Sequence, residues 1–251
     1  MKKIWLIICL ALVGATIGVT ILGSQSSASG PSFVLQATTG AITLDTAFPV
    51  SPSTAPTYKV LSTDSFFEGT PKLMEVKSSI PSETEAPALA VKAMEKYGGI
   101  PDNAVLHKVE SVYMNKFNLT SNTIEERYPQ WTLVIYEQQI RGSPVIGPGA
   151  EIWIALGENG ELLQVDKVWR TVEYAEDVPV ISAEEAYEKL QKGELLEKYQ
   201  SPLAGIKISD IRLGYYAEDR ARDQKYFTPV WIFTGTDQGN NTIRLPVTAT
   251  R

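Results

Sequence analysis

The chain has 251 residues, of which 43% are hydrophobic and 21% are charged, so it has enough apolar side chains to bury a core and is not a disordered chain. Its formal net charge is −6, and no run of clustered lysine and arginine side chains occurs. Because neutralising phosphates requires such clusters, we expect no nucleic acid among its partners.

The amino terminus carries a long apolar run. Residues Ile4–Leu22 are 19 consecutive residues without a charge, preceded by Lys2 and Lys3. As a helix this run would span roughly 28 Å, close to the thickness of a bilayer core, which predicts a single-pass transmembrane anchor within residues 1–23. The two lysines would stay in the cytoplasm, so the body is expected outside the cell membrane. The alternative is a signal peptide cleaved near Ala28, which would leave the body secreted.

The segment that follows is expected to hold the body away from the membrane. Residues 24–80 are rich in Ser, Thr, Pro and Gly, which predicts a stalk or irregular lead-in with at most an edge strand. The only cysteine, Cys9, precedes it, so the exported part forms no disulfide. Asn118 and Asn240 begin acceptor patterns for glycosylation, and their modification is left open.

A helix and a set of strands are predicted next. Ser82 has the features of an N-cap, because Glu85 completes a capping box and an apolar stripe follows. Gly98 and Gly99 are expected to end this helix. Strands are then predicted at 104–117, 128–139, 151–156 and 161–169, the last two joined by a turn at 157–160.

The same order recurs further along the chain. A second capping box begins at Ser182, 100 residues after Ser82, and Trp231 follows Trp131 at the same offset. Strands are predicted here at 206–216, 226–233 and 242–247. We therefore interpret the chain as a tandem duplication with an α+β fold, whose units are 81–175 and the shorter 176–251. Each unit would be one helix packed on a small antiparallel sheet.

Groups that carry common chemistries are scarce. His107 is the only histidine, so neither a Ser-His-Asp triad nor a two-histidine metal site is predicted, and His107 is expected to be structural or on the surface. The sequence has no exported cysteine nucleophile and no phosphate-binding or calcium loop, so we expect no catalytic residue, cofactor or metal. The remaining candidates for acid–base chemistry are Glu125 with Glu126, and Asp219 with Asp223, in segments typical of solvated loops.

Aromatic side chains are the other candidate signal. Trp131 and Trp231 are expected in the core, whereas Trp153 lies on the strand face opposite its apolar neighbours and is expected to be exposed. Trp153, Tyr215 and Tyr216 form the predicted partner-binding surface.

Several segments resemble a known family. The stretches EKYGGIPDNAVL (95–106), GPGAEIWIALGENGELLQVDKVWR (147–170), ISAEEAYEKL (181–190) and GYYAEDRARDQKYFTPVWIF (214–233) are similar to PepSY-type repeats, which resemble the propeptide domain of thermolysin-type proteases. One amino-terminal anchor before two such repeats also resembles the YycI and YycH regulators, which act on a sensor histidine kinase. The resemblance implies two cystatin-like units and a non-catalytic role.

The leading hypothesis is a membrane-anchored, extracytoplasmic binding protein that modulates or inhibits a protein partner of the sensor kinase or protease type. Its alternatives are a structural protein of the cell envelope and a carboxylate-based hydrolase. The partner's identity, the host and the oligomeric state stay open at this point.

Overall fold

The structure is a computed structural model that describes residues 5–8, 42–118, 120–121, 123–197 and 203–251. Within these residues it has two α-helices and three short 3-10 helices (η). The helices are α1 (Ala86–Met94), α2 (Ala183–Gln191), η1 (Pro71–Met74), η2 (Glu95–Tyr97) and η3 (Glu158–Gly160). The strands are β1 (Trp5–Ile8), β2 (Thr43–Leu44), β3 (Thr54–Gly69), β4 (Ala104–Asn118), β5 (Thr123–Ile140), β6 (Ser143–Ile146), β7 (Glu151–Leu156), β8 (Leu162–Pro179), β9 (Lys207–Tyr216), β10 (Tyr226–Phe227), β11 (Pro229–Thr236) and β12 (Thr242–Thr248).

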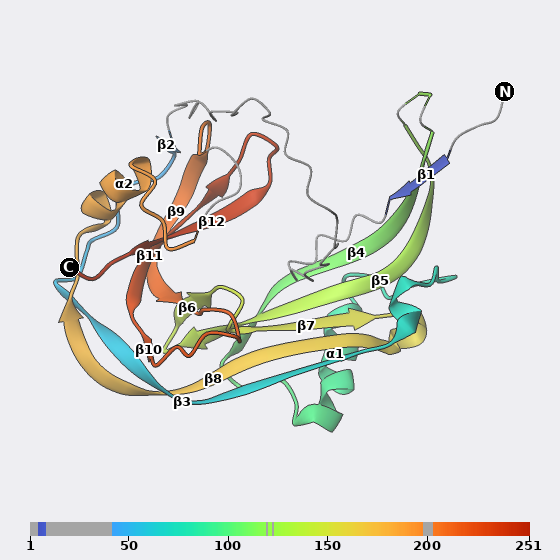
Figure 1. Ribbon diagram of the computed structural model, residues 1–251, viewed down its shortest axis with the longest axis horizontal. Helices are drawn as coiled ribbons and strands as arrows, with labels where there is room; N and C mark the ends of the chain where they lie inside the picture. Colours follow the sequence, from blue (N-terminus) through green and yellow to red (C-terminus); the bar gives the residue numbers. More distant parts are fainter. Residues whose placement is uncertain (1–4, 9–41, 119, 122, 198–202) are drawn as a thin grey trace, which may run out of the picture.

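All of these strands belong to one mixed sheet in the order β10-β3-β8-β7-β5-β6-β9-β11-β12, with β4 beside β5, β1 beside β4 and β2 beside β9. Strands β3, β4, β5 and β8 have 15 to 18 residues each. Over such lengths the right-handed twist of the strands accumulates. The sheet therefore curls into an open half-barrel with a concave and a convex side (Figure 1).

The short strand β6 joins the two parts of this sheet. It pairs antiparallel with the end of β5 through Gln139 and Ile140, and parallel with β9 through Val145 and Ile146. The two-residue turn between β5 and β6 has positive φ at both positions, 50° at Arg141 and 83° at Gly142. That geometry matches the twist of a tight hairpin, so β6 folds back against β5 and presents its other edge to β9.

Both predicted capping boxes form, but only α2 begins at one. The Ser182 hydroxyl accepts a bond from the Glu185 N–H at 3.1 Å, and the Glu185 carboxylate accepts one from the Ser182 N–H at 2.9 Å. The Ser82 and Glu85 pair forms the same two bonds at 3.3 and 3.2 Å. Ser82 is nevertheless not the N-cap of α1, because the regular helix begins only at Ala86 and Glu85 takes the cap position.

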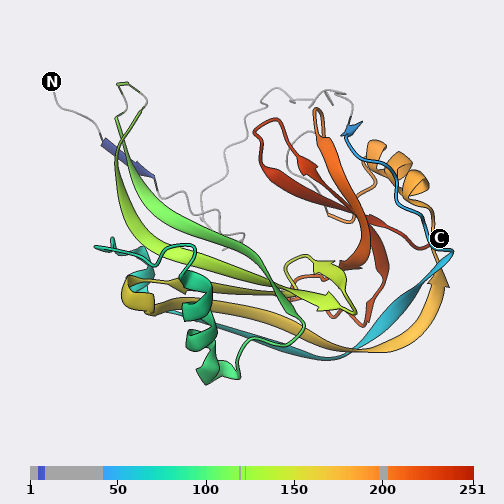
Figure 2. The same ribbon diagram turned by 180° about the vertical axis from the view of Figure 1, so that it is seen from behind.

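The two helices cover opposite ends of the curled sheet (Figure 2). Helix α1 buries Ala86, Ala90 and Met94 against apolar side chains of β5, β7 and β8. Helix α2 buries Ala183, Ala186 and Leu190 against β9, β11 and β12. Two tryptophans are also in the core as predicted, with Trp131 3% and Trp231 1% exposed.

The expected fold class is wrong. Two separate cystatin-like units, each a helix on a small antiparallel sheet, do not form, because β6 links the strands into one large mixed sheet. Strand β8 runs on from one expected unit into the other, and β3, from the segment expected to be a stalk, pairs with β8 from Thr54 to Gly69. The Ser- and Thr-rich composition of β3 is typical of a linker, but Thr and aromatic residues also favour exposed strands.

The expected transmembrane helix is also corrected. In the part of the chain that the structure describes, no helix is long and apolar enough to cross a membrane. Trp5–Ile8, at the start of the predicted anchor, form β1, which pairs with the end of β4. The rest of the run, residues 9–22, lies outside the described residues. The four residues of β1 are too few for hydrophobic periodicity to separate helix from strand.

A buried arginine fastens two loops to the sheet at the junction of its two parts. Arg170 on β8 is 2% exposed, and its guanidinium donates to the carbonyl oxygens of Gly149 and Glu218, each at 2.9 Å. Gly149 permits this approach, because a Cβ there would lie 1.8 Å from the Glu218 oxygen. The backbone carbonyl of Arg170 accepts a bond from the Gln138 amide at 2.7 Å, which ties the arginine to β5.

Replacing this arginine should destabilise the whole fold. Arg170→Met keeps much of the apolar stem but leaves the carbonyls of Gly149 and Glu218 buried without donors. We expect the free energy of unfolding to fall by about 3 kcal/mol, measured by urea denaturation. The matched control is Arg222→Met, since Arg222 lies exposed on the nearby loop. If the free energy of unfolding fell no further in Arg170→Met than in Arg222→Met, these hydrogen bonds would not be what holds the loops to the sheet.

Candidate functional site

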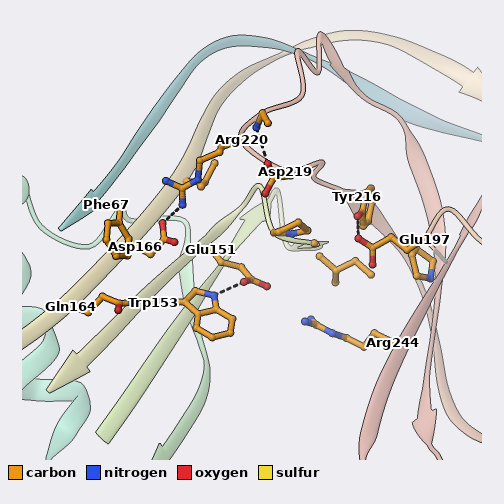
Figure 3. Close-up of a pocket in the computed structure, with 16 residues that line it drawn as sticks. Phe67, Glu151, Trp153, Gln164, Asp166, Glu197, Tyr216, Asp219, Arg220 and Arg244 are labelled. Carbon is orange, nitrogen blue, oxygen red and sulfur yellow. Dashed lines mark hydrogen bonds and ion pairs between the residues drawn. The ribbon is translucent and has the colours of Figure 1, made fainter. Parts of the chain in front are cut away.

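A cleft of about 850 Å³ lies on the concave side, at the junction of the two parts of the sheet. Its walls come from β3, β7 and β8 on one side and from β9, β12 and the loops after β6 and β9 on the other (Figure 3). Cavities of this size accommodate a small molecule or a few residues of a peptide. The polar and aromatic side chains that line it are Phe67, Glu151, Trp153, Gln164, Asp166, Glu197, Tyr216, Asp219, Arg220 and Arg244.

Strand alternation in β7 places two of these side chains. Ile152, Ile154 and Leu156 are fully buried in the core beneath α1. Because successive residues of a strand point to opposite faces, Glu151 and Trp153 point to the concave side and line the cleft. The indole Nε1–H of Trp153 donates to Glu151 Oε2 at 2.5 Å, so the two side chains hold one another in place.

Two arginine side chains at the edges of the cleft form ion pairs with carboxylates. Arg244 on β12 forms a two-bond ion pair with Glu137 on β5, one of its bonds measuring 2.7 Å from Nη1 to Oε2. His107 on β4 joins this pair, with its Nδ1 3.3 Å from Glu137 Oε2. Arg220, in the loop after β9, forms an ion pair with Asp166 of β8. Both links connect one part of the sheet to the other.

Two carboxyl groups of the cleft, those of Glu151 and Glu197, hold their protons more tightly than in water. Burial raises the pKa of Glu151 to about 7, opposed by the Trp153 hydrogen bond, while the charges of Glu137 and Glu197 raise it further and Arg244 lowers it. Burial also raises the pKa of Glu197, which accepts a hydrogen bond from the Tyr216 hydroxyl. The pKa of His107 is lowered, chiefly by burial, against the opposing effect of Glu137. A cleft that disfavours bare negative charge in this way is typical of a functional site.

The structure brings together two of the three residues predicted for partner binding. Trp153 and Tyr216 both line the cleft. Tyr215 does not, because the next residue of a strand points to the other face. It is 3% exposed, packs against Tyr58 and Phe227, and donates its hydroxyl to the Pro56 carbonyl at 3.0 Å.

The carboxylates considered for catalysis are not brought together. Glu125 and Glu126 lie near the start of β5, away from the cleft, where Glu125 accepts a bond from Asn118 and Glu126 one from Lys116. Asp219 lines the cleft, but Asp223 borders a separate hollow beside β3. Among the described residues, no group of three His, Cys, Asp or Glu side chains has a geometry that could hold a metal ion.

Sequence reasoning missed Glu137, Glu151, Glu197 and Arg244. Only Glu151 carried a local signal, since it occupies the same strand face as Trp153 in the alternating segment EIWIAL. Glu137, Glu197 and Arg244 lie far apart in the sequence, and only the tertiary fold brings them close to one another.

Three comparisons with known proteins were made. No family model and no curated protein matches the chain. A solved structure similar to it is the crystal structure of an uncharacterised protein from Eubacterium rectale ATCC 33656, at 16% identity and a TM-score of 0.35. The match covers 68% of this chain and 53% of that one, so the chain spans about half the length of that protein.

The raised pKa of Glu151 makes a prediction about stability. Its ordinary value of 4.5 holds in the unfolded chain, while the folded state keeps the proton until about pH 7. Between these values the folded state binds more protons, so the contribution of Glu151 to stability falls as pH rises from 4.5 to 7 and is constant above it. The free energy of unfolding of Glu151→Gln should therefore exceed that of the wild type by roughly 3 kcal/mol at pH 8. At pH 4 the two values should be nearly equal.

Chemical denaturation across this pH range measures the effect. Glu173→Gln on β8, whose side chain is 53% exposed, serves as the control and should stay within about 0.5 kcal/mol of the wild type throughout. If the difference in unfolding free energy between Glu151→Gln and the wild type stayed constant from pH 4 to pH 8, the pKa of Glu151 would not be raised in the folded state.

Proposed function

We propose that this protein is a non-catalytic, extracytoplasmic binding protein that modulates a protein partner by holding one of its segments in the cleft. The observation that carries the proposal is a ligand-sized cleft that combines the part-exposed aromatic side chains Trp153 and Tyr216 with charged groups. Tryptophan, tyrosine and arginine dominate the energetics of protein interfaces, because they combine a large apolar surface with a polar tip. The charge-free run behind Lys2 and Lys3 supports export of the body.

The arrangement of the charged groups favours binding over catalysis. Two carboxylates of this region, Glu137 and Asp166, are held in ion pairs with Arg244 and Arg220. These pairs connect different elements across the cleft and so stiffen its walls. A rigid, preformed site reduces the ordering cost of binding a partner.

A carboxylate-based hydrolase is the second candidate, and one observation favours it. A pKa of about 7 at Glu151 is suited to a general acid at neutral pH. Such a mechanism also needs a second carboxylate that stays ionised, as nucleophile or base. Glu197 is a poor choice for that role, since burial raises its pKa as well. Asp219 is the other carboxylate of the cleft that forms no ion pair within the described residues.

The two candidates are separated by measurements on full-length protein variants. We expect crosslinking from native membranes or culture medium to recover one protein partner with the wild type and with Tyr226→Ala, which removes an exposed aromatic outside the cleft. Trp153→Ala should recover at least about tenfold less, as for a residue worth more than 1.4 kcal/mol of binding.

If Trp153→Ala recovered as much of the partner as the wild type does, the cleft would not be the binding site. Turnover of a glycoside or ester substrate by the wild type, abolished in both Glu151→Gln and Asp219→Asn, would instead establish the hydrolase. Thermal melts of all the variants confirm that a loss of binding does not arise from unfolding.

A further inference from the structure

The ionisable side chains that line the cleft are unequal in sign. Four are acidic, namely Glu151, Asp166, Glu197 and Asp219, and two are basic, namely Arg220 and Arg244. Both arginines already form ion pairs, Arg220 with Asp166 and Arg244 with Glu137 behind the wall. In the described part of the chain, no basic side chain forms an ion pair with the remaining three carboxylates of the cleft. The cleft therefore has an excess of acidic groups in surroundings that disfavour bare negative charge.

Two of these carboxylates come from different walls of the cleft. Glu151 comes from β7, and Glu197 comes from the segment after α2 (Figure 3). They are near enough for the charge of Glu197 to raise the pKa of Glu151. Each already accepts one hydrogen bond from an aromatic side chain of its own wall, Glu151 from Trp153 and Glu197 from Tyr216. A carboxylate accepts several hydrogen bonds, so both keep acceptor capacity for a donor placed between them.

The aromatic side chains of the cleft fit the same kind of ligand. Trp153 is part-exposed and is held at its Nε1 edge by Glu151, and Tyr216 lies beside Glu197 on the far wall. An ammonium or guanidinium group gains from the face of a tryptophan or tyrosine ring as well as from a carboxylate. A metal ion is held mainly by carboxylate, imidazole or thiolate ligands, and the described residues contain no metal-binding group of three.

The geometry points to a lysine or arginine side chain of the partner as the group that enters the cleft, placed between Glu151 and Glu197 and against Trp153. This inference rests on the proposed binding function and adds the chemistry of the bound segment. Arginine is favoured over lysine, because its planar guanidinium stacks on aromatic rings and donates to two carboxylates at once. The acidic balance of the whole chain, −6, adds long-range attraction for a basic segment.

Binding of a cation also has an expected pH dependence. Glu151 is surrounded by Glu137, Glu197, Arg244 and Trp153, and its pKa lies near 7 without a ligand. A bound cation favours the ionised carboxylate, so binding below pH 7 releases a proton and is weakened as the pH falls. The affinity for a basic ligand should therefore rise between pH 5.5 and pH 7.5 and level off above it.

The test uses two short peptides that differ only in charge. Acetyl-Gly-Arg-Gly-amide and acetyl-Gly-citrulline-Gly-amide have side chains of nearly the same shape, but citrulline is neutral. Each is titrated into the full-length protein and followed by calorimetry at pH 7.5. We expect saturable binding of the arginine peptide, at least about tenfold weaker binding of the citrulline peptide, and a loss of about tenfold in Glu151→Gln and in Glu197→Gln. Glu173→Gln should bind like the wild type.

The outcomes separate this inference from the function on which it rests. Equal affinity for both peptides, no saturable binding of the arginine peptide, or unchanged affinity in both cleft variants would overturn the cationic ligand. If Trp153→Ala nevertheless recovered less of the protein partner, the proposed binding function would still be supported. Because Glu151→Gln is expected to be more stable than the wild type at this pH, a loss of binding in that variant cannot be attributed to unfolding.

Discussion

The pairing of the four-residue strand β6 with both β5 and β9 is the constraint on which the rest of the structure depends. Without it the strands beneath α1 and those beneath α2 would be two separate sheets. The approach of β6 to β9 is close enough to require glycine at Gly214, where a Cβ would lie 2.5 Å from the Pro144 carbonyl oxygen. The chain leaves β6 directly into the loop that Arg170 holds, so the same junction also forms one wall of the cleft.

The cleft lies at a junction held by both apolar and charged contacts. Each helix covers one end of the sheet and buries a core there. At the junction itself, Val145 and Ile146 of β6 are buried in smaller apolar clusters, and charged links add to this packing. Arg244 joins β12 to β5, and Arg170 joins β8 to the loops. Such pairs give directional contacts that set the geometry of the walls, at the expense of desolvating the charges.

The electrostatics of the cleft result from this same arrangement. Arg220 and Arg244 form ion pairs with Asp166 and Glu137, and Arg170 donates to carbonyl oxygens. The charge of Arg244 lowers the pKa of Glu151, but burial outweighs it. The carboxyl groups of Glu151 and Glu197 are left in a partly dehydrated space, which is why their pKa values rise. A ligand with a positive charge would stabilise the ionised forms of Glu151 and Glu197, for which the fold provides no ion-pair partner among the described residues.

The sequence by itself determined the local elements. The capping boxes at Ser82 and Ser182, the turn at 157–160 and the strand 151–156 all form where they were predicted, because each depends on residues that are neighbours in the chain. Strand alternation also placed Trp153 on the face opposite Ile152 and Ile154, but the side chain is part-buried there against an apolar cluster and not exposed as expected. Only the tertiary structure decided that β3 pairs with β8, that β6 joins β5 to β9, and that Glu137, Glu151, Glu197 and Arg244 gather at one cleft. Strand pairing depends on partners distant in sequence and on packing across the sheet, and a local pattern contains no record of which partner a strand will have.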